Sequence, residues 1–205
     1  GMKILFDFGG VIVDLKKEAC ISAFDALGFD IRPHLGTYYQ GGAFRLLENG
    51  DIDCPAFFDA IRQECGLPLS DLDITRAWEA YLTGIPRERL SLIRRIRQHY
   101  PTYVLSNTNP IHWEQGLRDF FPQEGYGIDD YFDHLFLSYE LHQLKPDAEI
   151  YQTVVDTIGG DAADILFLDD SEANCQAARD AGLQARIAPA GGEWMRYFDE
   201  NGRLL

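Results

Sequence analysis

Short apolar runs that end in polar residues recur along the chain, and they constrain its fold more than any other feature. The runs are KILFD (3–7), TYVLSN (102–107), HLFLS (134–138), DILFLDD (164–170) and LQARIA (183–188). Each run is too short for a helix, is rich in β-branched or aromatic residues, and lacks the alternation of a half-exposed strand. This pattern is typical of strands that are buried on both faces of a parallel sheet.

Helical patterns separate the later runs. They occupy RERLSLIRRIRQH (87–99), IHWEQGLRDFF (111–121), AEIYQTVVDTIGG (148–160) and EANCQAARDAG (172–182). The last two patterns end at glycine, as helix C-termini often do. Strands that alternate with helices from about residue 88 onward predict an α/β domain with a doubly wound parallel sheet.

The segment from residue 16 to residue 87 breaks this alternation. It carries helical spacing in KKEACISAFDALGFD (16–30), GGAFRLLENG (41–50), CPAFFDAIRQECG (54–66) and LDITRAWEAYLTG (72–84). Glycine or proline stands between these patterns, and no convincing strand is present. We therefore expect an α/β core domain formed by residues 1–15 and 88–205, with a helical domain at 16–87 inserted after the first strand.

Charge and composition limit the partners. The chain has 33 acidic and 18 basic residues and a formal net charge of −15, which repels phosphate backbones and argues against nucleic-acid binding. No apolar stretch approaches the roughly 20 residues that span a bilayer, and no signal-peptide pattern precedes the first run. The four cysteines show no CxxC pairing, which fits reduced thiols. We expect a soluble, cytoplasmic protein without a membrane partner; nothing indicates its oligomeric state.

Polar side chains stand where the predicted strands end, and ligands of parallel sheets bind beyond these ends. They are Asp7, Ser106, Asn107, Asp169 and Asp170. Lys145 adds a cation just before Pro146, which we expect to be the first residue of the next helix. Each residue alone has an ordinary structural explanation, as a turn residue, a helix cap or a solvated charge.

Taken together, these residues predict a cation site beside an anion site. Hard carboxylate oxygens suit Mg²⁺, which commonly bridges protein carboxylates to phosphate. A lysine and a helix N-terminus can hold phosphate oxygens. An aspartate in such a setting can act as a nucleophile and form an aspartyl-phosphate.

The ordered motifs FDFGGV, LSNTN, LKP and FLDDSEAN resemble those of the haloacid dehalogenase-like superfamily. The resemblance is greatest to its sugar-phosphatase branch, which includes α-D-glucose-1-phosphate phosphatases. It spans the chain, with Asp7 in the first motif, Ser106 in the second, Lys145 in the third and Asp169–Asp170 in the fourth. The segment 16–87 resembles the family's helical cap, so the resemblance implies a Rossmann-like core with an inserted cap.

The resemblance also implies a Mg²⁺-dependent phosphatase in which an aspartate is the nucleophile. Asp7 would accept the phosphoryl group and also bind the metal. Asp170 would bind Mg²⁺ directly and Asp169 through a coordinated water, and the backbone carbonyl of Gly9 would complete the protein ligands.

The remaining family roles concern the phosphoryl group. Ser106 and the amide of Asn107 would hold its oxygens during transfer. Lys145 would neutralise charge between Asp7 and the phosphate. Phosphoryl transfer needs mainly positioning and charge neutralisation, and residues of these types can provide both.

Gly9 departs from the usual family pattern, which has a second aspartate at this position as the general acid. A positioned acid or base typically contributes about 100- to 10,000-fold. Three interpretations stay open: a slower phosphatase, a phosphatase that borrows another group such as Asp14, or a protein that binds a phosphorylated ligand or partner without turnover. The presence of Asp7, Ser106 and Lys145 favours an enzyme, because a binding protein needs no nucleophile.

The expected substrates are small phosphorylated metabolites, most readily sugar phosphates, because a helical cap over the site would exclude large molecules. Residues of TYYQGGAFR (37–45) are candidates to contact the sugar, with Arg45 as the charged one. The dehalogenase reaction is disfavoured, since family members that perform it have different residues after the nucleophile.

Overall fold

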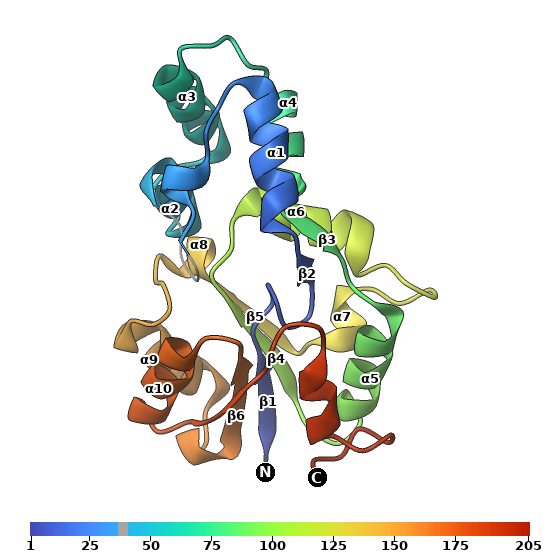
Figure 1. The fold of residues 1–205 in the computed structure, drawn as a ribbon. Coiled ribbons are helices and arrows are strands. Elements are labelled where there is room, and N and C mark those ends of the chain that lie inside the picture. The colour runs from blue at the N-terminus through green and yellow to red at the C-terminus, as the bar shows by residue number, and fades with distance from the viewer. Residues whose placement is uncertain (37–40) are drawn as a thin grey trace.

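The structure, a computed structural model, describes residues 1–36 and 41–205. Its centre is a five-stranded sheet in the order β5-β4-β1-β6-β7, with every neighbouring pair parallel (Figure 1). The strands are β1 (Lys3–Phe6), β4 (Thr102–Ser106), β5 (His134–Leu137), β6 (Ile165–Asp169) and β7 (Gln184–Ile187). They coincide with the five apolar runs, so the predicted sheet is confirmed.

Helices cover both faces of this sheet, which explains why the inner strands β1, β4 and β6 are almost completely buried. Ile4 and Phe6 of β1 join one buried cluster, and Leu5 joins another. Figure 1 shows α5 (Arg87–Arg97) and the 3₁₀ segment η4 (Glu193–Tyr197) on one side, and α9 (Ala148–Ile158) and α10 (Glu172–Asp180) on the other. The doubly wound α/β class is therefore confirmed.

The remaining elements of the core are short. They are α6 (Pro110–Gln115), the π-helical turn η2 (Gly116–Phe120), α7 (Ile128–Tyr131), α8 (Ser138–Leu141) and the 3₁₀ turn η3 (Ala162–Asp164). The expectation that Pro146 begins a helix was wrong: the Lys145–Pro146 peptide is cis, and α9 begins at Ala148.

The inserted segment forms a helical layer beyond the carboxyl ends of the strands (Figure 1). Its helices are α1 (Lys17–Leu27), η1 (Arg32–His34), α2 (Gly42–Glu48), α3 (Cys54–Cys65) and α4 (Asp71–Glu79). The Phe44 ring lies 5.0 Å from that of Phe57 and 4.8 Å from that of Trp78, inside an apolar cluster separate from those of the sheet. This cluster also includes Ile111 of α6, where the inserted helices pack on the core, and the division at 16–87 stays a prediction. No helix in the described residues has the length and apolarity needed to cross a bilayer.

A two-stranded antiparallel ribbon lies where the chain passes between core and cap. β2 (Asp14–Leu15) pairs with β3 (Leu82–Gly84). The expectation of no strand within 16–87 was therefore wrong. A pairing this short leaves too few residues for a periodic pattern, so the sequence could not reveal it.

Candidate active site

The strand order brings the predicted site residues together. Because β1 lies between β4 and β6, Asp7 stands between Ser106 at the end of β4 and Asp169 at the end of β6. The Asp7 amide donates a hydrogen bond of 2.9 Å to the carbonyl of Leu168. All three polar side chains are buried at the sheet edge.

A cavity opens at this edge and is lined by both the core and the inserted helices. Its lining includes these residues predicted from the sequence: Asp7, Gly9, Ser106, Asn107, Lys145 and Asp170. Asp169 is fully buried and does not line the cavity. Glu48 and Tyr81 face the same cavity from the inserted segment.

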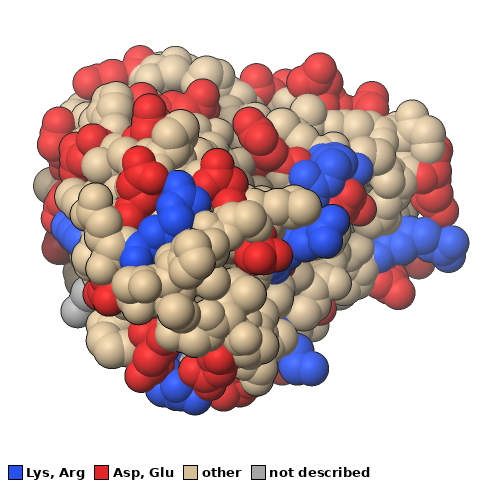
Figure 2. Space-filling model, turned by 90° about the horizontal axis from the view of Figure 1, so that it is seen from above, with Lys and Arg blue, Asp and Glu red and all other residues tan. Residues whose placement is uncertain are grey.

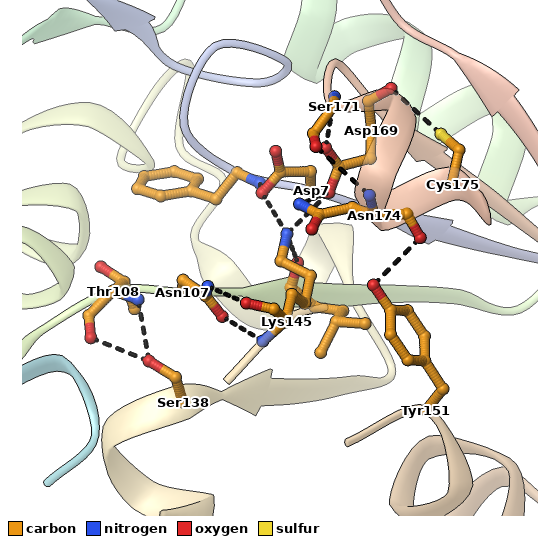
Figure 3. Close-up of polar contacts among 12 residues, drawn as sticks. Asp7, Asn107, Thr108, Ser138, Lys145, Tyr151, Asp169, Ser171, Asn174 and Cys175 are labelled. Carbon is orange, nitrogen blue, oxygen red and sulfur yellow. Dashed lines mark hydrogen bonds and ion pairs between the residues drawn. The ribbon is translucent and has the colours of Figure 1, made fainter. Parts of the chain in front are cut away.

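Lys145 holds the acidic side chains of the site together (Figure 3). Its Nζ lies 2.9 Å from Oδ1 of Asp7 and 2.8 Å from Oδ2 of Asp169, and donates at 3.2 Å to the carbonyl of Leu105. Burial alone would lower the pKa of Lys145, but Asp169 and Asp7 raise it above its ordinary value. The lysine is therefore a fixed cation at neutral pH.

Asp169 anchors this arrangement from beneath the cavity. Its Oδ1 accepts a hydrogen bond of 2.8 Å from the amide of Ser171, and its Oδ2 accepts one of 3.1 Å from Nδ2 of Asn174. With Lys145 also on Oδ2, both carboxylate oxygens are engaged. These bonds let Asp169 hold Lys145 in place.

The three aspartates of the site crowd one another. Asp7, Asp169 and Asp170 each present an oxygen atom, and these atoms lie within 4.8 Å of one another. Burial first, then Asp169, raises the pKa of Asp7 well above its usual range, while Lys145 opposes the rise. The same two causes raise the pKa of Asp170 to about 6. An all-oxygen donor set with excess negative charge fits a hard divalent cation such as Mg²⁺.

Asn107 fixes the segment that carries Lys145. Its Nδ2 donates at 3.0 Å to the carbonyl of Lys145, and its Oδ1 accepts at 2.9 Å from the Lys145 amide. The side-chain amide of Asn107 is thus engaged with the backbone.

The two glycines after Asp7 have different structural requirements. Gly10 has φ +81°, and a Cβ there would lie 2.9 Å from Oδ2 of Asp170. Gly9 is outside the left-handed region, and a Cβ there would meet only the Leu15 side chain, at 3.6 Å. The backbone therefore requires glycine at Gly10 and tolerates a side chain at Gly9.

Two further candidates from the sequence do not lie in the cavity. Asp14 forms an ion pair of 2.7 Å between its Oδ1 and Nη1 of Arg89, a buried side chain, and does not line the cavity. The hypothesis that Asp14 replaces the missing acid was wrong for this reason. Arg45 is exposed on α2 and is not among the lining residues. Of the segment 37–45, residues 37–40 lie outside the described residues.

Sequence reasoning missed two buried titratable groups that line the cavity, Glu48 and His112. Burial raises the pKa of Glu48 to about 8. Phe44, Leu47 and Glu48 are the buried residues of α2, a spacing that places the acid on the apolar face of the helix. That spacing is the sequence pattern from which the burial of Glu48 could have been predicted. No comparable pattern indicated the burial of His112, because this side chain packs against α4, which is distant in sequence.

His112 joins α6 of the core to α4 of the cap. Its Nε2 donates at 2.8 Å to the carbonyl of Trp78, and the two rings stack at 4.2 Å. Burial lowers the pKa of His112 to about 4. The side chain is therefore neutral at pH 7.

We expect His112 to make the fold sensitive to acid. Its pKa is lower in the folded than in the unfolded chain, so its contribution to stability is complete above about pH 6.5 and falls as the pH drops toward 4. The shift corresponds to about 3 kcal/mol. Urea unfolding of the wild type and of His112→Gln should show a difference in stability that shrinks between pH 6.5 and 4. A stability difference between the two proteins that does not change with pH would show that His112 is not the cause of acid sensitivity.

The sequence matches the family model of haloacid dehalogenase-like hydrolases over residues 4–182. The chain belongs to the haloacid dehalogenase-like hydrolase family. The predicted resemblance is confirmed, and so is the class of enzyme, a hydrolase of this family.

Several relatives extend this comparison. The chain is 33% identical to the D-ribitol-5-phosphate phosphatase of Bacteroides thetaiotaomicron, over 93% of each chain. It is 25% identical to the glyceraldehyde 3-phosphate phosphatase of Pyrococcus abyssi, over 95% of this chain and 81% of that one. A family enzyme from B. thetaiotaomicron, crystallised with magnesium and inorganic phosphate, matches with a TM-score of 0.92 and 37% identity, covering 97% of this chain and 100% of that one.

Proposed function

We propose that this protein is a Mg²⁺-dependent phosphomonoesterase that transfers the phosphoryl group of a small metabolite to Asp7 and then to water. The observation that carries the proposal is the placement of Lys145 between Asp7 and Asp169 at the floor of a cavity that also presents Ser106 and Asp170. A nucleophile, a fixed cation and a hydroxyl donor thus face one space. These are the groups that phosphoryl transfer requires.

In this proposal Asp7, Asp170 and the carbonyl of Gly9 would hold Mg²⁺, and Asp169 would act through a coordinated water. When bound, the ion neutralises phosphoryl charge and orients the group for attack. A bound cation would also offset the repulsion among the aspartates, which would favour the ionised, nucleophilic form of Asp7.

The other residues position and stabilise the phosphoryl group. Ser106 Oγ and the backbone N–H of Asn107 donate hydrogen bonds to its oxygens. Lys145 lies beside Asp7, where negative charge builds up during the transfer. The non-catalytic alternative gives no reason for a buried lysine to be held against the carboxylate of Asp7.

Small phosphorylated sugars or polyols are the proposed substrates. The two named relatives are phosphatases of a phosphorylated polyol and of a phosphorylated aldose, and residues of the inserted segment line part of the cavity. Figure 2 shows carboxylates spread over the cap-side face, with Lys and Arg side chains in small separate groups. That surface, with the net charge of −15, supports the exclusion of nucleic acids.

The first test is phosphate release from a panel of phosphorylated sugars, polyols and 4-nitrophenyl phosphate. We expect turnover that needs Mg²⁺, stops with excess EDTA and returns when Mg²⁺ is added back. Nucleotide and phosphopeptide substrates in the same panel serve as controls for the size limit. Turnover that EDTA leaves unchanged would contradict the metal assignment.

A further inference from the structure

The missing acid at Gly9 matters for the substrates proposed above. A primary alkyl phosphate, such as a 5-phosphopolyol, releases a poorly acidic alcohol whose oxygen must be protonated as it leaves. Asp14 is held by Arg89 outside the cavity, so another group must supply this proton. His112 is unsuitable, because its Nε2–H already bonds to Trp78 and burial keeps the pKa of the ring near 4.

Glu48 is the third carboxyl group that lines the cavity, besides Asp7 and Asp170. It is the last residue of α2 and is only 6% exposed. Burial raises the pKa of Glu48 to about 8, against the opposing effects of Lys145, Arg45 and Asn109. Asn109 lies beside it, but its Nδ2 does not reach an acceptor in ordinary hydrogen-bond geometry. With a pKa of about 8, the Glu48 carboxyl group is mostly protonated at pH 7.

Contacts between cap and core hold Glu48 at the cavity. Ser138 Oγ, at the start of α8, donates at 2.6 Å to the Glu48 carbonyl and accepts at 3.0 Å from the amide of Thr108, another cavity-lining residue. Nδ1 of His142 lies 3.1 Å from the carbonyl of Asn49. These bonds place the end of α2 against the loop that carries the phosphate-binding residues.

The chain also passes closely by α8 just beyond Glu48. Gly50 has φ +72°, and a Cβ there would overlap the carbonyl oxygen of Tyr139. Only glycine permits this approach. The position of Glu48 is thus set by the docking of α2 on the core.

We propose that Glu48 is the general acid and base of the phosphatase reaction, in the role that the family usually gives to a side chain at the position of Gly9. This inference rests on the proposed function. In the first step a carboxylate oxygen of Asp7 attacks phosphorus, the bond from phosphorus to the leaving oxygen breaks, and that oxygen takes the Glu48 proton. In the second step the Glu48 carboxylate takes a proton from water as the water oxygen attacks phosphorus, and the bond between phosphorus and the Asp7 oxygen breaks. Phosphate leaves, and both side chains return to their starting forms.

The test compares leaving groups. We expect Glu48→Gln to lower kcat/KM about 100- to 1,000-fold on the best primary alkyl phosphate of the panel, because the amide cannot donate the proton. On 4-nitrophenyl phosphate, whose leaving group needs no proton, kcat/KM should change less than about threefold. Glu79→Gln is the matched control, since Glu79 is a partly buried cap glutamate that pairs with Arg118 and does not line the cavity. Glu79→Gln should leave kcat/KM unchanged on both the alkyl phosphate and 4-nitrophenyl phosphate.

A rescue variant separates proton transfer from a merely structural role. Gly9 tolerates a side chain, so Gly9→Asp can supply the family's usual acid. In the Glu48→Gln background it should raise kcat/KM on the alkyl substrate at least about tenfold. Equal losses on alkyl and aryl substrates in Glu48→Gln, or no rescue, would overturn the role of Glu48. Wild-type turnover confined to 4-nitrophenyl phosphate would overturn that role too while leaving the phosphatase function intact. No wild-type turnover of any phosphate with Mg²⁺ would overturn the proposed function itself.

Discussion

Asp7→Asn is expected to lower phosphate release by at least about 10⁴-fold, the scale of losses seen when a covalent nucleophile is removed. The amide keeps the shape of the side chain and can still accept the hydrogen bond of 2.7 Å that the Phe8 amide donates to Oδ1. It cannot attack phosphorus. The loss should appear in kcat on every substrate of the panel, including 4-nitrophenyl phosphate.

The same variant should not lose stability. In the wild type, burial and then Asp169 make the charged form of Asp7 costly, and Lys145 keeps its ion pair with Asp169 when Asp7 is neutral. We expect a Tm in EDTA equal to or above that of the wild type. A folded Asp7→Asn protein with near-normal turnover would show that Asp7 is not the nucleophile.

Lys145→Met is expected to have the second-largest effect, on both stability and activity. Removing the cation leaves Asp7 and Asp169 facing each other without compensation, and breaking a buried ion pair from one side typically costs about 3–5 kcal/mol. Urea unfolding should be measured in EDTA, so that a bound cation does not replace the lost charge. Phosphate release should also fall by at least about 100-fold, because the charge that stabilises the transfer is lost.

A double variant provides the control for this prediction. Asp7→Asn combined with Lys145→Met removes one of the two opposed carboxylates, so it should be more stable than Lys145→Met alone. A single Lys145→Met variant as stable as the wild type in EDTA would contradict the assignment of Lys145 as the cation of a buried network.

The sequence predicted the residues whose positions depend on the sheet. Asp7, Ser106 and Asp169 directly follow or end parallel strands, and parallel strands place their carboxyl ends at one edge. The position of each residue at the end of a predicted strand was enough to infer that the three side chains lie close together. This holds even though β1 and β6 are far apart in sequence. The double hydrogen bond between Asn107 and the lysine backbone then holds the segment that carries Lys145 at this edge.

The parts that the sequence did not predict depend on packing between distant segments. Glu48 reaches the cavity only because α2 docks on α8 through Ser138, and no local pattern encodes that contact. Asp14 lies near the site along the chain but is drawn to Arg89, a residue of α5. In both cases the partner comes from an element tens of residues away, which periodicity and spacing do not report.

The covalent intermediate on Asp7 is the central claim, and a single-turnover trap tests it most directly. Enzyme with Mg²⁺ would be mixed with a limiting amount of a labelled phosphate ester, quenched in acid within the first turnover, and digested for mass spectrometry. We predict the phosphoryl group on the peptide that contains Asp7, absent when EDTA replaces Mg²⁺ and absent in Asp7→Asn. A protein that turns over the ester while this peptide stays unmodified at every quench time, or that carries the label on another residue, would contradict the account.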